Sequence, residues 1–206
     1  MSANSVQISV VEQIDPATAA RGPKAYAARL AQVLATQDWT PVHALTRLLA
    51  DAWRGGHAVF ICGNGGSAAN ATHWANDFVY PVARTGRGLR ISALSANTAV
   101  LTCLANDLGY EKVFAHQLRV MAKSQDVLIV LSGSGNSPNI IEALHTAREM
   151  GMRTVGVLGF SGGAALPLVD LAIHFAIDDM QIAEDLQLVV NHMVMQALSV
   201  DGVARD

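Results

Sequence analysis

Residues 126–144 read DVLIVLSGSGNSPNIIEAL, a short apolar run followed by a glycine- and serine-rich loop and then by a helical pattern. The apolar run is nearly continuous, which is typical of a strand that is buried on both faces of a sheet. Glycine lets the backbone turn sharply where such a strand ends. This stretch therefore predicts a buried strand that leads through a tight loop into a helix.

The same alternation extends along the chain on both sides of this stretch. Residues 57–62 form another apolar run, which ends in the loop Gly63–Ser67 and is followed by a helical pattern. Three more apolar runs lie at 90–94, 153–159 and 170–177, and further helical patterns lie near 97–105, at 111–123, at 138–150 and at about 181–199. Short apolar strands interleaved with helices indicate a parallel sheet covered on both faces. We predict a three-layer α/β/α sandwich with a parallel five-stranded sheet.

The segment before the first strand has helical spacing of its apolar residues from about Pro23 to Trp53. It reads as two helices separated near Asp38–Pro41. We expect residues 1–56 to form an N-terminal helical segment that packs on the core and at a subunit interface, and residues 57–200 to form the α/β domain. The chain as a whole is expected to be one globular unit.

Composition excludes several classes of protein. The chain has 206 residues with a net charge of -3, and 51% of them are hydrophobic but only 15% charged. The slightly acidic balance argues against nucleic-acid binding through a charged face. There is no apolar run long enough to span a membrane and no secretory signal at the start, and two cysteines indicate a reducing cytoplasm. So little charge favours an oligomer with buried apolar surface, although an alanine- and valine-rich monomer is the alternative.

Two glycine-rich loops, Gly63–Ser67 and Ser132–Ser137, each follow a strand and open a helix. Backbone N–H groups at a helix start attract anions, and serine hydroxyls add neutral donors that suit a phosphate. The alternative is two tight turns in which serine and asparagine cap the helices. Neither loop has the lysine of a nucleotide-binding P-loop or the third glycine of a dinucleotide site. We therefore expect a phosphate ester of a small polar molecule.

Four side chains are candidates for acid–base or metal chemistry. His73 and Asp77 stand four apart on the helix after the first loop, so they share a face. Such a pair can hold a divalent metal, can act as acid and base, or can be an ordinary surface pair. Glu184 and His192 lie on the last helix, and the apolar neighbours of His192 leave open whether it is a core histidine or a functional one.

Three segments resemble the sugar isomerase (SIS) domain family, and within it the phosphoheptose isomerase group. They are GNGGSAANATHWANDF at 63–78, LANDLGY at 104–110 and LSGSGNSPNIIEAL at 131–144. The resemblance runs from about residue 25 to 200. It implies a flavodoxin-like SIS domain, a homotetramer with active sites at subunit interfaces, and a zinc ion. The implied reaction is the aldose–ketose isomerisation of a phosphorylated sugar, sedoheptulose 7-phosphate to a heptose 7-phosphate, through an enediol.

The resemblance also implies roles for individual residues. The expected substrate-binding residues are Asn64, Gly65, Gly66, Ser67, Asn106, Asp107, Ser132, Gly133, Ser134, Ser137 and Glu184. The expected zinc ligands are His73, Asp77, Glu184 and His192, although Asp77 stands where the group has glutamate and Glu184 where it has glutamine. We expect Asp77 or Glu184 to be the catalytic base, with His192 as proton donor. Glu184 and His192 can share a metal only if Glu184 lies at or before the helix start, because eight residues rise about 12 Å along a helix.

The two glycine-rich loops do not separate an enzyme from a binding protein. A related group within the family consists of non-catalytic SIS tetramers that bind a partner protein such as a replication initiator. Retention of His73, Asp77, Glu184 and His192 favours the enzyme. A sugar-phosphate-sensing regulator would need a DNA-binding extension, for which the chain has no room.

Overall fold

The structure is a computed structural model that describes residues 22–80, 82 and 88–200. The chain divides into two compact units, residues 1–37 and 38–206. The first unit contains helix α2 (Pro23–Thr36), which begins with a proline in its first turn. The second unit contains all the other described elements. The division therefore falls between the two expected N-terminal helices.

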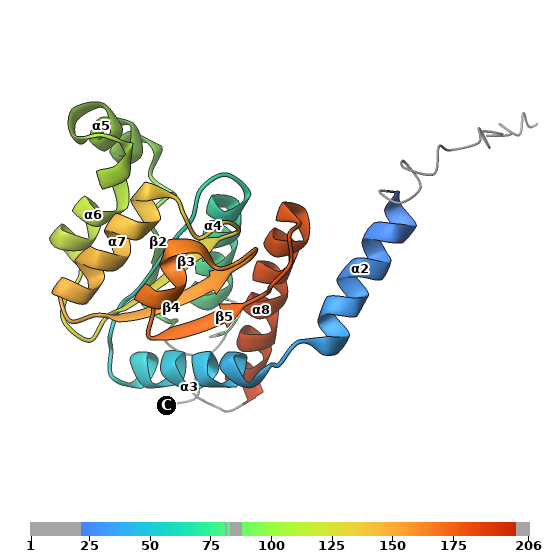
Figure 1. The fold of residues 1–206 in the computed structure, drawn as a ribbon. Helices are drawn as coiled ribbons and strands as arrows, with labels where there is room; N and C mark the ends of the chain where they lie inside the picture. The colour runs from blue at the N-terminus through green and yellow to red at the C-terminus, as the bar shows by residue number, and fades with distance from the viewer. Residues whose placement is uncertain (1–21, 81, 83–87, 201–206) are drawn as a thin grey trace, which may run out of the picture. The chain divides into compact units, whose positions relative to one another are not determined.

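The second unit is built on a five-stranded sheet whose strands are all parallel (Figure 1). The strand order is β2-β1-β3-β4-β5, so the order reverses at β1. The strands are β1 (Val59–Cys62), β2 (Ile91–Ala93), β3 (Val127–Ser132), β4 (Arg153–Leu158) and β5 (Leu171–His174). The predicted parallel five-stranded sheet is thus confirmed.

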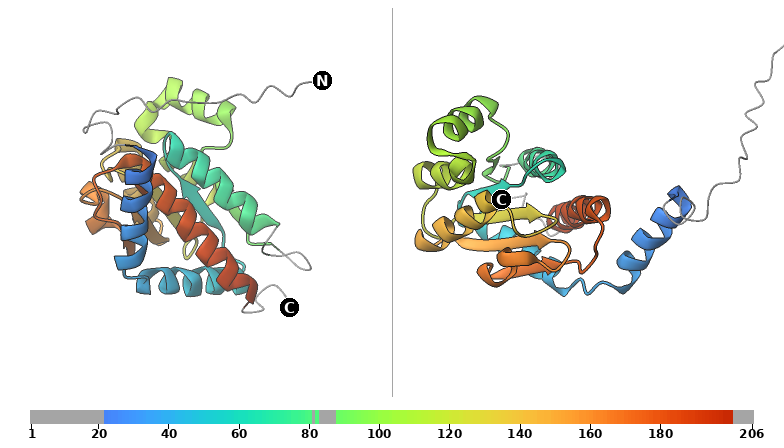
Figure 2. Two further views of the ribbon diagram at one scale, coloured as in Figure 1. Left: turned by 90° about the vertical axis from the view of Figure 1, so that its right-hand side faces the viewer. Right: turned by 45° about the horizontal axis from the view of Figure 1, so that its top comes forward.

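Helices cover both faces of the sheet (Figure 2). They are α3 (Thr40–Arg54), α4 (Gly66–Val79), α5 (Thr98–Leu108), α6 (Val113–Met121), α7 (Pro138–Glu149) and α8 (Met180–Val200). Helices α3 and α4 both pack on α8, whereas α6 and α7 pack on each other. The three-layer α/β/α sandwich is also confirmed. Within the described part of the chain, no helix combines the length and hydropathy needed to span a membrane.

The core explains why the strands carry almost no polar residues. Every residue of β1 and β3 is buried, because helices lie on both sides of them. Phe60 and Leu128 belong to the cluster formed with α6 and α7, which includes Phe114 and Leu144. Helix α3 buries one stripe of its surface, centred on Leu45, and lies against α8 and β5.

The segment after β4 contains a short 3₁₀ helix, η3 (Gly163–Leu168). Gly162 and Gly163, at its beginning, both have positive φ angles. Two of its backbone N–H groups donate to the second glycine-rich loop: Ala165 N to Gly135 O at 2.9 Å and Ala164 N to Asn136 Oδ1 at 2.9 Å. A second short 3₁₀ helix, η2 (Tyr110–Lys112), links α5 to α6.

Candidate functional site

The two glycine-rich loops lie side by side at the carboxyl edge of the sheet. Strands β1 and β3 are neighbours, with Cys62 paired to Val130, so the loops that follow them begin next to each other. In parallel sheets this edge, at the point where strand order reverses, is the usual ligand site. A cavity of about 270 Å³ opens there. Its lining residues are Asn64, Gly65, Ser67, Leu131, Ser132, Gly133, Ser134, Ser137, Met180 and Glu184.

The first loop is held from the neighbouring helix. Asn64 and the buried Asn139 of α7 exchange two amide hydrogen bonds of 2.9 and 2.8 Å. The hydroxyl of Tyr110 donates to the same Asn64 oxygen at 2.9 Å. Gly65, the residue before α4, has a φ of 56°, a conformation that favours glycine. The loop is therefore fixed before any ligand arrives.

The second loop is held by its own serines. Ser132 Oγ accepts a hydrogen bond from Gly135 N at 3.0 Å, and Ser134 Oγ accepts one from Asn136 N at 3.3 Å. A hydroxyl that accepts in this way keeps its own proton free to donate. Both serines can therefore donate into the cavity while they shape the loop.

Glu184 lies over the start of α4. The side chain belongs to α8 and lines the cavity, and a methyl group at Gly66 would clash with its carboxylate. Among the described residues that line the cavity, only Glu184 is ionisable. The site therefore contains one acidic group beside neutral donors.

A buried amide fixes α8 against α4 next to this carboxylate. Gln187 donates to Ser67 Oγ at 3.0 Å and accepts from Asn70 at 2.9 Å. The Asn70 amide also donates to the backbone oxygen of Glu184 at 2.9 Å. Neither Gln187 nor Asn70 is predictable from the sequence as a site residue, because a single amide on a helix carries no distinctive pattern.

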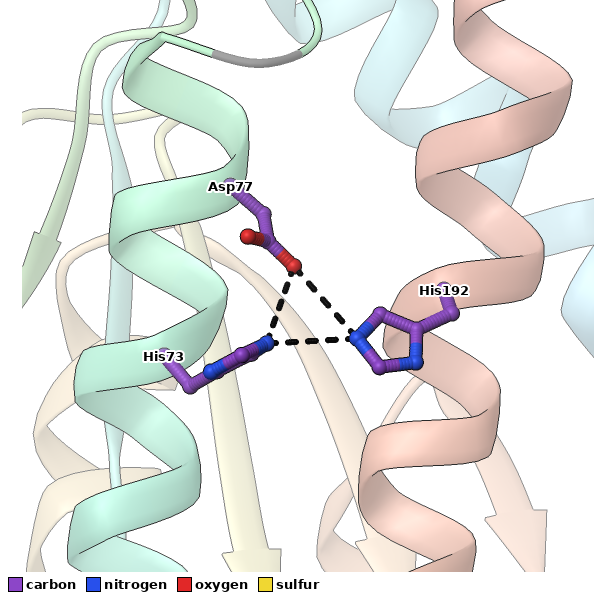
Figure 3. Close-up of side chains that lie close together, drawn as sticks. All are labelled: His73, Asp77 and His192. Carbon is purple, nitrogen blue, oxygen red and sulfur yellow. Dashed lines mark hydrogen bonds and ion pairs between the residues drawn. The ribbon is translucent and has the colours of Figure 1, made fainter.

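Three of the four expected metal ligands come together between α4 and α8. Figure 3 shows His73, Asp77 and His192 with their side chains pointing toward one another. His73 Nε2 lies 3.2 Å from His192 Nε2 and 3.2 Å from Asp77 Oδ2, and His192 Nε2 lies 3.7 Å from the same oxygen. Both imidazoles are about half exposed, with 46% and 49% of the side chain accessible. We call these three residues the His–Asp–His group.

The shape of this group fits zinc. Ligands about 2.1 Å from a tetrahedral zinc ion are about 3.4 Å apart. The three donor atoms form a triangle with sides of 3.2, 3.2 and 3.7 Å, which is one face of such a tetrahedron. Imidazole nitrogen and carboxylate oxygen are both zinc ligands, and the exposed side of the group leaves room for a fourth ligand.

Asp77 differs from the two histidines in being buried, with 7% of the residue accessible. Its Oδ2 accepts a hydrogen bond of 2.7 Å from Asn191, and its Oδ1 accepts one of 3.2 Å from Asn76. Both oxygens are therefore engaged by amides. Asn191 is not predictable from the sequence as a site residue, because one asparagine among the apolar residues of a helix forms no distinctive pattern.

The remaining expected site residues lie outside the His–Asp–His group, some at the cavity and some away from it. Glu184 is not part of the His–Asp–His group, because α8 already begins at Met180 and Glu184 lies eight positions before His192 on this helix. Asn106 and Asp107 lie on the exposed face of α5 and do not line the cavity. The Asn106 amide donates to Asp107 Oδ1 at 2.7 Å. Gly66 borders the cavity through its contact with Glu184.

Comparison with known proteins gives consistent results. Residues 24–159 match the SIS domain family. The chain is 37% identical to the phosphoheptose isomerase of Chlorobaculum parvum over 176 residues, which covers 83% of each protein. It is 37% identical to that of Geotalea daltonii over 163 residues, 79% of this chain and 85% of the relative. The solved structure of phosphoheptose isomerase from Neisseria gonorrhoeae superposes with a TM-score of 0.79 at 27% identity, covering 88% of this chain and 96% of that one.

Proposed function

The chain belongs to the SIS domain family, and we propose that it is an enzyme that interconverts the aldose and ketose forms of a phosphorylated sugar, sedoheptulose 7-phosphate and a heptose 7-phosphate. One observation carries the proposal. The cavity at the carboxyl edge of the sheet combines both glycine-rich loops with one carboxylate. Relatives named phosphoheptose isomerase favour this reaction over a binding role without catalysis.

The second loop would hold the phosphate. Ser132, Ser134 and Ser137 line the cavity, and the loop leads into α7, whose free backbone N–H groups carry partial positive charge. None of the described lining residues is a lysine or an arginine. Neutral donors would therefore bind the phosphate, and the serines that accept from the loop backbone would donate to it.

Glu184 would be the catalytic base. Isomerisation needs a group that removes a proton from the carbon next to the carbonyl, and that group must lie within reach of the bound sugar. Glu184 is the acidic side chain in the cavity, whereas Asp77 is buried outside it and both its oxygens accept hydrogen bonds. The structure therefore favours Glu184 over Asp77, the two candidates from the sequence.

The His–Asp–His group would hold one zinc ion. The side chains of His73, Asp77 and His192 supply the ligands, and the triangle of their donor atoms supports this assignment. A zinc ion bound there would act as a Lewis acid toward a substrate oxygen at the open position. His192 would then be a ligand in place of the proton donor that the sequence predicts. Glu184 is not part of the proposed ligand set.

Incubation of the purified protein with sedoheptulose 7-phosphate tests the proposal directly. We expect a heptose 7-phosphate to form, detected by chromatography with mass-selective or pulsed amperometric detection. Chelator-treated protein should lose turnover, and added zinc should restore it. A sample of the same protein without substrate, and substrate with heat-denatured protein, serve as controls. Absence of turnover in the zinc-loaded protein would contradict the proposed function.

We further propose a cytoplasmic homotetramer with active sites at subunit interfaces. Two features support this assembly: α5, which carries Asn106 and Asp107, buries none of its residues within the chain, and large apolar side chains are exposed on α6. A partner copy could cover this surface.

A further inference from the structure

We propose that Asn191 is a positioning residue that holds the carboxylate of Asp77 toward His73 and His192. The Asn191 amide donates to Asp77 Oδ2 at 2.7 Å. That oxygen is the one that lies 3.2 Å from His73 Nε2 and 3.7 Å from His192 Nε2. The inference rests on the zinc site of the proposed function and assigns a role to a residue outside the ligand set.

The surroundings of Asn191 argue that its amide is not there for packing. The residue is completely buried, and its neighbours Val190 and Val194 on α8 are buried as well. A buried polar group destabilises a protein unless it is hydrogen-bonded, and Asn191 Oδ1 has no hydrogen-bond partner in the described part of the chain. An apolar side chain would suit this environment better. The hydrogen bond to Asp77 is what the amide contributes.

The direction of this hydrogen bond has a consequence for Asp77. Asn76 donates to Oδ1 at 3.2 Å while Asn191 donates to Oδ2, so the two amides fix the plane of the carboxylate. Asn191 approaches from α8 and Asn76 from α4, the two helices that also supply the histidines. The carboxylate is therefore oriented from both sides of the site. Without Asn191, Asp77 Oδ2 would be free to turn away from the imidazoles.

Metal affinity tests this role. Asn191→Leu keeps the side chain's size and removes its amide. Thr146→Val is the matched control, because Thr146 is also a buried residue whose side-chain oxygen lacks a partner, but it lies on α7. The probes are Zn²⁺, titrated against a chromophoric chelator, and Co²⁺, followed by its visible absorption. Groups that orient a metal ligand contribute about 10- to 100-fold to affinity. We expect that loss in Asn191→Leu and unchanged affinity in Thr146→Val.

A stability measurement accompanies the titration. The metal-free Asn191→Leu protein should still fold, with an unfolding temperature below that of the wild type, because the substitution removes the hydrogen bond to the buried Asp77 carboxylate. If that variant does not fold, Asn191→Ser carries the test, since its shorter side chain cannot reach Asp77 and the same loss of affinity is expected. A folded variant with wild-type affinity and an unchanged Co²⁺ spectrum would overturn the proposal, and so would a wild-type protein that binds neither ion. Turnover of sugar phosphate by the wild type is measured separately, so failure of the proposed function remains distinguishable.

Discussion

Glu184 and Asp77 are both carboxylates next to α4, but their surroundings give them different chemistry. Glu184 faces a cavity lined by neutral donors, whereas Asp77 is buried and accepts from two amides. A base must reach its substrate, while a metal ligand must keep one orientation. The arrangement of neighbours, and not the residue type, separates the two roles.

Replacing Glu184 with glutamine should therefore remove the proposed catalytic base without changing the fold. We expect kcat to fall by about 10²- to 10⁴-fold with little change in zinc affinity. Asp185→Asn is the matched control, because it removes the same charge from the next, exposed position of α8 and should leave kcat unchanged. Steady-state kinetics and a zinc titration check both variants. Full activity in Glu184→Gln together with an inactive Asp77→Asn would assign the base to Asp77 instead.

Gly66 provides an independent test of the Glu184 position. A methyl group there would clash with the end of the Glu184 side chain, which is flexible enough to move away. Gly66→Ala should thus lower kcat at least tenfold and leave the unfolding temperature nearly unchanged. Gly135→Ala is the contrast: Gly135 has a φ of 67°, and its methyl group would meet the rigid backbone carbonyl of Gly162. The unfolding temperature of Gly135→Ala should be clearly lower than that of the wild type. Wild-type kcat in Gly66→Ala would contradict the placement of Glu184.

At the scale of elements, the strands and helices were largely predictable from the sequence. The runs of buried residues in β1 and β3 and the glycines that follow them define strand–loop–helix units locally. Contacts between elements were not predictable in the same way. Whether Glu184 could be a metal ligand depends on where α8 begins. If the helix began one turn later than Met180, Glu184 would lie at its start and could approach the ligands. The contact between Asn191 and Asp77 depends on how α8 packs against α4, which the sequence does not specify.

Helix α5 differs from the other α-helices of the second unit in having no fully buried residue. Its N-terminus is capped by Asn97, whose side chain accepts a hydrogen bond from Val100 N at 3.1 Å. Loss of such a cap costs about 1 kcal/mol. An element with so little packing opens locally before the whole domain unfolds. The cap should therefore control the local stability of α5.

Asn97→Ala should lower the hydrogen-exchange protection of residues 98–108 about fivefold, as expected for a loss of about 1 kcal/mol. Protection in α7 and the global unfolding temperature should stay at wild-type values. Asn97→Asp keeps an acceptor at the cap and should preserve protection in α5. Equal exchange in wild type and Asn97→Ala would show that the cap does not hold this helix.

At the scale of the whole molecule, 51% of the residues are hydrophobic and 15% are charged, and some large apolar side chains are exposed on the described surface. Val120 and Met121 at the end of α6 are 72% and 45% exposed. They border a groove of about 660 Å³ between α5, α6 and the edge strand β2. Its other lining residues are mostly apolar and include Leu94, Val100 and Leu104. A groove of this kind on the second unit is the surface that a partner copy would cover in the proposed homotetramer.

A charge placed in this groove should therefore disrupt the assembly. In Val120→Lys an ammonium group would have to be buried without a partner, so light scattering after size exclusion should show species smaller than the proposed tetramer. The free energy of unfolding of the separated chain should change by less than about 0.5 kcal/mol, because the position is exposed within the chain. Val120→Leu keeps the surface apolar and should assemble as the wild type does. A tetrameric Val120→Lys protein would place the interface elsewhere, and a monomeric wild type would contradict the tetramer itself. Turnover and zinc affinity of the smaller Val120→Lys species then separate the two sites. Lower turnover would mean that the substrate site needs residues of a second copy, and unchanged zinc affinity would mean that one chain alone forms the His–Asp–His group.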